Sequence, residues 1–324
     1  MIYFYLPEFY YKHDLNTCII RLLRTNPELF YDDIEIGAVY GCFPGSIWNG
    51  GRCMSGWCSK EKMEMTIDEY NNQLHVPLRF TFTNCMLRKE HLDDAYCNMQ
   101  LKLADNGMNE VLVNSDILDE YIRYEKELQL QDGGNNLLVP KFHYFGNGEN
   151  RIISSTTKRL LSKQSVLDEL FYEDTHEYRY KLVVLDYIFN NTDDLFESPL
   201  SDNADKFELL LNAYCQDECP SRARHYKQLS IQQLEFMENT PDFGGCCHIN
   251  DDFYDVMEAR KSFIKREDLY GKYKDAGYQH FKIEGRTNSV YDVLESYLYY
   301  MVKPEYIDKV RLKALKAMEQ AVRR

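Results

Sequence analysis

The stretch 207–226, FELLLNAYCQDECPSRARHY, begins as an apolar run and ends in polar and sulfur-containing residues. The run has the length of a strand and stops at Asn212, after which Cys215 and Cys219 follow with three residues between them. Short apolar runs bounded by turn residues are typical of strands buried on both faces of a parallel sheet. The stretch therefore predicts a buried strand whose carboxyl end carries reactive groups.

Apolar runs of the same kind recur along the chain and alternate with helix-like segments. The other runs are IYFYL (2–6), IEIGAVYG (34–41), LRFTFTN (78–84), EVLVNS (110–115), RIISST (151–156), KLVVLDYIF (181–189) and HFKIEG (280–285). The helix-like segments are residues 15–26, 88–107, 115–130, 165–173, 289–302 and 305–322. This alternation predicts an α/β fold, and eight strands favour a (β/α)8 TIM-like barrel. A doubly wound sheet is the alternative.

The expected barrel is a single domain over residues 1–324, with insertions near 131–150 and 227–275 and a C-terminal helix. The net charge of −14 argues against strong non-specific binding to nucleic acid, although a local basic groove is compatible with it. The amino-terminal MIYFYLPEFYY lacks the features of a signal peptide, and no stretch approaches the roughly 20 apolar residues of a membrane span. We therefore expect a soluble, cytoplasmic protein without a membrane span.

The ten cysteines of a protein in a reducing compartment are expected to be thiols or metal ligands. Cys215 and Cys219 follow the seventh strand, and Cys42, after the second strand, is expected at the same barrel mouth. Cys246 and Cys247 follow two glycines before the last strand. Because iron–sulfur clusters and zinc take thiolate ligands, Cys42, Cys215, Cys219 and one of Cys246 or Cys247 form a candidate metal site. Ordinary buried thiols are the alternative.

Three segments resemble the U32 peptidase family. HFKIEGRTNSVYDVLESYLYYMVKPEY (280–306) resembles its K-[IL]-E-G-R segment and the tyrosine-rich helix that follows, and GGRCMSG (50–56) resembles half of a cysteine motif. YCQDECP (214–220) resembles the C-x-x-x-C-P ligand pair of the branch that assists oxygen-independent ubiquinone hydroxylation. The resemblance implies a barrel with an oxygen-sensitive [4Fe–4S] cluster, and zinc is the alternative occupant. It also implies oxygen-independent hydroxylation or RNA base modification, as an enzyme or as its iron–sulfur subunit.

The last predicted strand carries charges that are expected to face the barrel interior. Lys282 and Glu284 alternate with apolar neighbours, and Arg286 follows at the mouth. We assign catalytic roles to Glu284, Arg286 and Asp186, because active sites of such barrels lie at the carboxyl ends of strands.

Residues with anion-binding or polar side chains near the same mouth are assigned to substrate binding. They are Lys158, Arg222, Asn212 and Lys282. For each of these residues the alternative is a structural role, since buried charges need partners, polar residues cap helices, and surface lysines are simply solvated.

Two other classes of function stay open at this stage. A zinc-stabilised barrel could serve as a scaffold or binding protein. Alternatively, Asp116, Asp186 and Glu284 could act as acid and base in a hydrolase, although the chain has neither the H-E-x-x-H nor the G-x-S-x-G motif. An RNA substrate is expected to need a partner subunit that supplies a basic surface.

Overall fold

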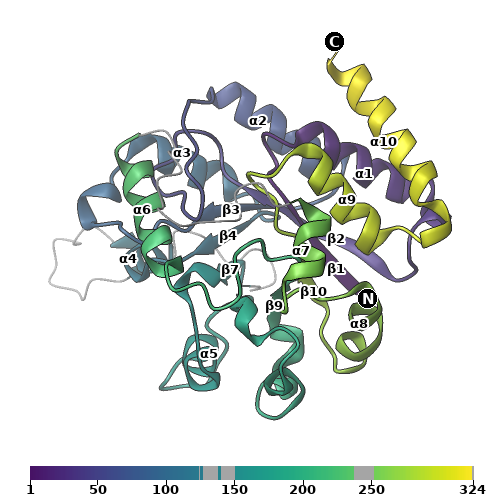
Figure 1. Cartoon of the computed structure of the whole chain (residues 1–324). Helices are drawn as coiled ribbons and strands as arrows, with labels where there is room; N and C mark the ends of the chain where they lie inside the picture. The colour runs from purple at the N-terminus through teal and green to yellow at the C-terminus, as the bar shows by residue number, and fades with distance from the viewer. Residues whose placement is uncertain (124, 127–137, 140–149, 237–251, 323–324) are drawn as a thin grey trace, which may run out of the picture.

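The computed structural model describes residues 1–322 except 124, 127–137, 140–149 and 237–251. In this part of the chain, eight parallel strands close into a barrel (Figure 1). The strands, in their order around the barrel, are β1 (Ile2–Pro7), β2 (Ile34–Gly41), β3 (Leu78–Phe82), β4 (Glu110–Val113), β7 (Ile152–Ser154), β8 (Leu182–Val184), β9 (Phe207–Leu210) and β10 (His280–Lys282). Each strand overlaps one of the apolar runs, so the expected (β/α)8 TIM-like barrel is confirmed.

Helices cover the outside of the barrel (Figure 1). The expected helices are present as α1 (His13–Thr25), α3 (Ala95–Ala104), α4 (Asp116–Arg123), α5 (Lys163–Leu170), α9 (Val290–Met301) and α10 (Ile307–Val322). The sequence did not predict α2 (Lys60–Asp68), α6 (Arg222–Leu234), α7 (Phe253–Ala259) and α8 (Arg266–Asp268). The segment 227–275, expected as an insertion, therefore holds most of α6 and all of α7 and α8.

Most of the other expected insertion, 131–150, lies outside the described residues. Its described part includes the short strand β6 (Leu138–Val139), which pairs with β5 (Glu125–Lys126) in an antiparallel ribbon. Among the described helices, none combines the length and the apolar character that crossing a membrane requires.

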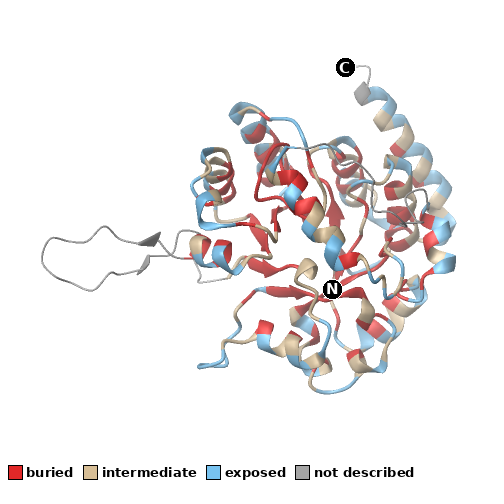
Figure 2. Cartoon of the chain, turned by 60° about the vertical axis from the view of Figure 1, so that its left-hand side comes forward, coloured by how far each residue is buried: buried red, intermediate tan, exposed pale blue. Residues whose placement is uncertain are grey.

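The alternation of side chains along each strand produces two packing layers. Phe4 and Phe80 point outward and join the large apolar core between the strands and the helices. Tyr5, Tyr40 and Leu210 point inward and pack together inside the barrel. Figure 2 shows the buried residues concentrated on the strands and on the inward faces of the helices.

Charged side chains also meet inside the barrel. Arg79 on β3 is fully buried and donates a hydrogen bond of 2.8 Å to Glu110 on the neighbouring β4. It forms a second ion pair across the barrel with Glu208 on β9, and its guanidinium carbon lies 3.9 Å from the ring centroid of Tyr5. The amine of Lys282 on β10 lies 3.7 Å from the Glu208 carboxylate. We call Arg79, Glu110, Glu208 and Lys282 the interior charge network.

Pairing makes this burial of charge tolerable. Burial alone raises the pKa of Glu110, but Arg79 and Lys181 outweigh it and lower that pKa to about 2. Lys181, whose side chain is 40% exposed, donates a hydrogen bond of 2.6 Å to Glu110. Since an uncompensated buried charge is strongly destabilising, loss of Arg79 affects two carboxylates at once.

Replacing Arg79 by Ala is therefore expected to reduce the free energy of unfolding by about 3–5 kcal/mol, because it leaves Glu110 and Glu208 buried without their shared cation. Urea titration followed by circular dichroism measures the change. The matched control is Arg88→Ala, whose side chain is 74% exposed and which should change stability by no more than about 0.5 kcal/mol. Equal effects of the two substitutions would contradict the role of the network.

Candidate functional site

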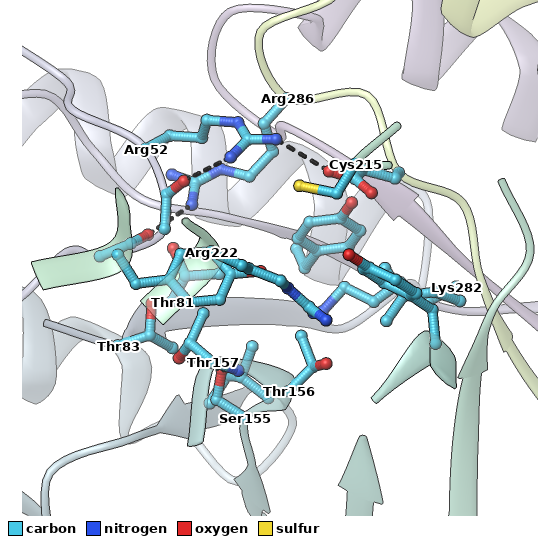
Figure 3. A pocket seen from close by; sticks show the side chains of 18 residues that line it. Arg52, Thr81, Thr83, Ser155, Thr156, Thr157, Cys215, Arg222, Lys282 and Arg286 are labelled. Atoms are coloured by element: carbon cyan, nitrogen blue, oxygen red, sulfur yellow. Dashed lines mark hydrogen bonds and ion pairs between the residues drawn. The ribbon is translucent and has the colours of Figure 1, made fainter. Parts of the chain in front are cut away.

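A cavity of about 80 Å³ opens at the carboxyl ends of the strands, where barrel enzymes carry their chemistry (Figure 3). Its lining brings together residues from β2, β3, β4, β9 and β10 and from the segments that follow β2, β3, β7, β8, β9 and β10. The cations are Arg52, Arg222, Lys282 and Arg286; the hydroxyl groups belong to Thr81, Thr83, Ser155, Thr156 and Thr157; the aromatic rings are those of Tyr40, Tyr187 and Tyr226; Glu284 and Cys215 complete the polar set. We call this cavity the mouth pocket.

The loop after β2 delivers Arg52 to the pocket. A Cβ on Gly50 would lie 2.2 Å from the carbonyl oxygen of Thr83, so only glycine lets the loop pack this closely against the end of β3. Asn49 then donates to the Arg52 carbonyl at 2.7 Å. In this position Arg52 forms an ion pair of 2.8 Å with Glu284.

Glu284 is held at the pocket from several directions. One carboxylate oxygen accepts from Arg52 and the other from the backbone N–H of Tyr214 at 3.2 Å. Asn212 fixes the Glu284 backbone, since its side chain accepts from the Glu284 N–H at 2.7 Å and donates to the Glu284 carbonyl at 3.1 Å. Asn212 is fully buried and does not line the cavity, so in this structure it positions Glu284.

Arg286 holds the loop after β2 in place. Its guanidinium donates to the Glu8 carboxylate at 3.2 Å, to the Gly50 carbonyl at 3.1 Å and to Asn49 at 2.9 Å. Burial raises the pKa of Glu8, and the charge of Arg286 opposes that rise. Arg286 reaches the cavity wall as expected, but its three nitrogens are engaged by the protein. It acts here as a positioning residue, and direct contact with a substrate stays a prediction.

Arg222, at the start of α6, links the pocket to Asp186. It donates to Asp186 at 2.7 Å and to the hydroxyl of Tyr226 at 3.0 Å, and it stacks over the ring of Tyr187 at 3.9 Å. Asp186 is fully buried, accepts from the N–H of Ile188 and does not line the cavity. Asp186 therefore contacts the pocket through Arg222, and its predicted catalytic role remains untested.

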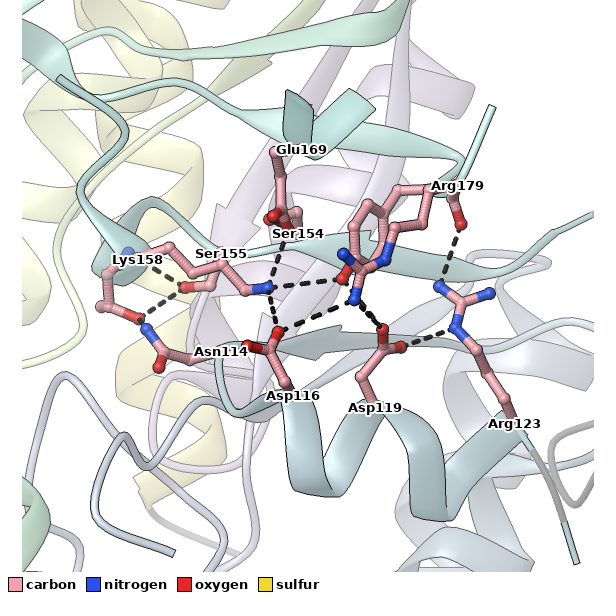
Figure 4. Close-up of polar contacts among 11 residues, drawn as sticks. Asn114, Asp116, Asp119, Arg123, Ser154, Ser155, Lys158, Glu169 and Arg179 are labelled. Atoms are coloured by element: carbon pink, nitrogen blue, oxygen red, sulfur yellow. Dashed lines mark hydrogen bonds and ion pairs between the residues drawn. The ribbon is translucent and has the colours of Figure 1, made fainter. Parts of the chain in front are cut away.

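Lys158 lies in a different polar cluster (Figure 4). Its amine bonds to Glu169 at 2.8 Å and to Asp116 at 3.1 Å. The cluster continues through Arg179, which lies 3.0 Å from Asp119 on α4. Lys158 is absent from the lining of the mouth pocket and ties α4 to α5, which explains its burial without a substrate.

The cysteines assigned to the metal site occupy different environments. Cys42 is fully buried in the outer core, its thiol lies 3.5 Å from the Gln100 side-chain oxygen, and burial raises its pKa to about 12. Cys215 lines the mouth pocket, and Cys219 is partly exposed. Cys246 and Cys247 lie outside the described residues. In the ranges that are described, no three His, Cys, Asp or Glu side chains gather as a metal site requires.

A cluster that includes Cys42 does not fit the described arrangement, because this thiol packs in the apolar outer core and does not line the mouth pocket as Cys215 does. The [4Fe–4S] cluster and the zinc alternative stay predictions, and no catalytic step is derived through either.

No protein-family model matches the sequence, and no curated protein matches it. A solved structure described as that of the U32 peptidase Mk0906 is similar to this chain with a TM-score of 0.49 and 13% sequence identity. The similarity covers 87% of this chain and 92% of the other. The site residues here are assigned from this structure alone.

Some residues of the pocket were not assigned from the sequence. Thr81 shares the inward face of β3 with Arg79, and this two-residue alternation within LRFTF is a signal that could have found both. Arg52 follows a glycine pair, which permits a close approach of the loop to the barrel mouth. Tyr226 lies on α6, a helix that the sequence did not predict.

The close packing of Gly50 makes the pocket sensitive to a single methyl group. Gly50→Ala is expected to lower the free energy of unfolding by about 1–3 kcal/mol, because the new Cβ forces the loop away from Thr83. Thermal and urea unfolding measure the loss. Ser55→Ala, an exposed position in the same loop, is the control and should leave stability unchanged. If Gly50→Ala leaves the free energy of unfolding unchanged, the loop is not anchored at Gly50.

Proposed function

We propose that the protein is a U32-like barrel enzyme that binds a small anionic substrate, or the anionic part of a larger one, in the mouth pocket. The observation that carries the proposal is the convergence of Arg222 and Lys282 on one cavity at the carboxyl end of the barrel. Arg52 also lines this cavity, but its three nitrogens are bonded to Glu284, Gly51 and Thr287. Arg222 supports it most directly, because its Nη2 makes no hydrogen bond to any residue that the structure describes and is available to a ligand.

The pocket also offers groups for substrate orientation and proton transfer. Among the carboxylates assigned to catalysis, Glu284 is the one that lines the cavity, and a carboxylate in that position can accept a proton from a bound substrate. The hydroxyl group of Thr83 can donate a hydrogen bond to a substrate oxygen, whereas that of Thr156 donates to the Leu185 carbonyl at 3.1 Å. Tyr187 and Tyr226 supply apolar walls that limit the access of water.

The finer proposal is an iron–sulfur protein of oxygen-independent hydroxylation or RNA base modification. The resemblance of residues 214–220 and 280–306 supports it, together with the position of Cys215 at the pocket wall. A cytoplasmic location, and a partner subunit or an RNA substrate, belong to the same proposal.

The hydrolase alternative is less well supported by the geometry. Asp116 has an 80% exposed side chain in the cluster of Figure 4, and Asp186 lies behind Arg222. These carboxylates therefore do not share the mouth pocket with Glu284, as an acid–base pair acting on one substrate requires.

Binding of malonate or phosphate, measured by isothermal titration calorimetry, tests the anion pocket. Arg222→Gln is expected to weaken binding roughly 10- to 100-fold, since a hydrogen bond to a charged group contributes about 1.5–3 kcal/mol. Arg224→Gln, an exposed position on the same helix, is the matched control and should bind as the unaltered protein does. Arg52→Gln provides a second test if Arg222→Gln does not fold. Failure of the unaltered protein to bind either anion would contradict the proposal.

Purification without oxygen tests the iron–sulfur part separately. We expect a brown protein with about four irons per chain, whose colour is lost in Cys215→Ala. Cys42→Ala should keep the colour, because that thiol lies in the apolar core. A colourless protein that holds one zinc would support the scaffold alternative. A protein without metal after anaerobic reconstitution would remove the iron–sulfur proposal and leave the anion pocket in place.

A further inference from the structure

Lys282 presents an amine to the mouth pocket from the end of the last barrel strand. Its side chain lines the cavity together with Tyr40 and Glu284, although only 4% of the residue is exposed (Figure 3). Backbone pairing with β1 and β9 on either side fixes its position, so the amine is held at the cavity wall by the barrel itself.

The amine is poorly solvated where it lies. It is 4.1 Å from the ring centroid of Tyr40 and 3.7 Å from the nearest Glu208 oxygen, and it makes no hydrogen bond to any residue in the described ranges. That Glu208 oxygen is itself buried without a hydrogen-bond partner there. Because an ammonium group has three donors to satisfy, such a site favours the neutral amine.

The charges around Lys282 act in both directions. Those that affect it from the neighbouring strands and from the pocket are Glu208, Arg79, Arg286 and Glu284, and the ring of Tyr40 covers the amine. Burial lowers the pKa of Lys282 to about 8, Glu208 opposes this effect, and Arg79 and Arg286 add to it. The neutral amine is therefore the minor form near pH 7 and becomes the major form above about pH 8, and it is the nucleophilic form.

We propose that Lys282 is a covalent nucleophile that forms an imine with the carbonyl carbon of a small 2-oxo acid bound in the mouth pocket. The proposal rests on the proposed anion-binding function. The free Nη2 of Arg222 offers a charge-assisted hydrogen bond to the carboxylate of such a ligand, and Thr83 offers a hydroxyl at the same cavity. The cavity of about 80 Å³ has room for a ligand of this size.

The reaction balances with the groups present and water. The amine lone pair attacks the carbonyl carbon, the carbonyl oxygen takes a proton from solvent at the pocket mouth, and the nitrogen gives a proton to Glu208. The carbinolamine then loses its hydroxyl group as water, which takes back the proton that Glu208 had accepted, while the nitrogen lone pair forms the C=N bond and Glu208 becomes a carboxylate again. In total, amine, oxo acid and one proton give iminium and water. The iminium carries the same charge as the ammonium form, so Glu208 keeps a cationic partner.

Reductive trapping tests the proposal in the intact protein. Incubation with pyruvate and sodium cyanoborohydride should add one reduced pyruvate per chain, and peptide mapping should place it on Lys282. Lys282→Arg keeps the charge and should abolish the adduct. The control is Lys181→Arg, which changes the lysine that pairs with Glu110 and should retain the adduct. Malonate, which has no reactive carbonyl group, should protect Lys282 in the unaltered protein, and this measurement needs no variant.

The pH dependence of trapping has a defined sign. Because the deprotonated amine reacts, labelling of Lys282 should rise with pH and level off above about pH 8. Exposed lysines should instead continue to gain reactivity up to about pH 10.4. Labelling spread over exposed lysines, without preference for Lys282, would overturn the proposal.

Calorimetry separates this proposal from the proposed function. If pyruvate binds equally to the unaltered protein and to Lys282→Arg and neither is trapped, the imine is wrong and the anion pocket stands. If the unaltered protein binds neither pyruvate nor malonate nor phosphate, both the proposal of an anion pocket and the proposal of an imine are wrong.

Discussion

The ion pairs of Arg79 inside the barrel constrain the strands and the mouth pocket at their carboxyl ends. The guanidinium joins β3 to the adjacent β4 through Glu110 and to the opposite β9 through Glu208. A barrel of this size is usually filled by apolar side chains, so charges in its centre must be paired before the strands can close. Glu208 also faces Lys282, and in this way the packing of the barrel interior sets the charge of a residue at the pocket wall.

The pocket is assembled by residues that hold one another in place. Arg286 and the closely packed Gly50 fix the loop after β2, that loop presents Arg52, and Arg52 with Asn212 fixes Glu284. Two of these contacts, Arg286 with Gly50 and Arg52 with Glu284, join segments that are more than 200 residues apart in the sequence. The chemistry left for a ligand belongs to the groups that the protein does not fully engage, chiefly Arg222 and the amine of Lys282.

The strands could be predicted because their apolar runs are short and bounded by turn residues; the run 34–41 coincides with β2. The inward direction of Lys282 also follows from alternation along the strand. The roles of Lys158 and Asn212 could not be predicted, since salt bridges and backbone clamps use the same residue types as substrate binding. Cys42 was expected at the mouth, but it follows the last residue of β2, where the alternation no longer fixes direction, and it packs in the outer core.

Burial and the charge of Arg79 lower the pKa of Lys282, and Glu208 opposes them. The most direct measurement is the titration of Lys282 by NMR with isotope-labelled lysine, assigned through Lys282→Arg. A pKa near 8, which falls further in Glu208→Gln because the opposing carboxylate is gone, is the predicted result. A pKa near the ordinary lysine value of about 10.4, unchanged by Glu208→Gln, would contradict the account.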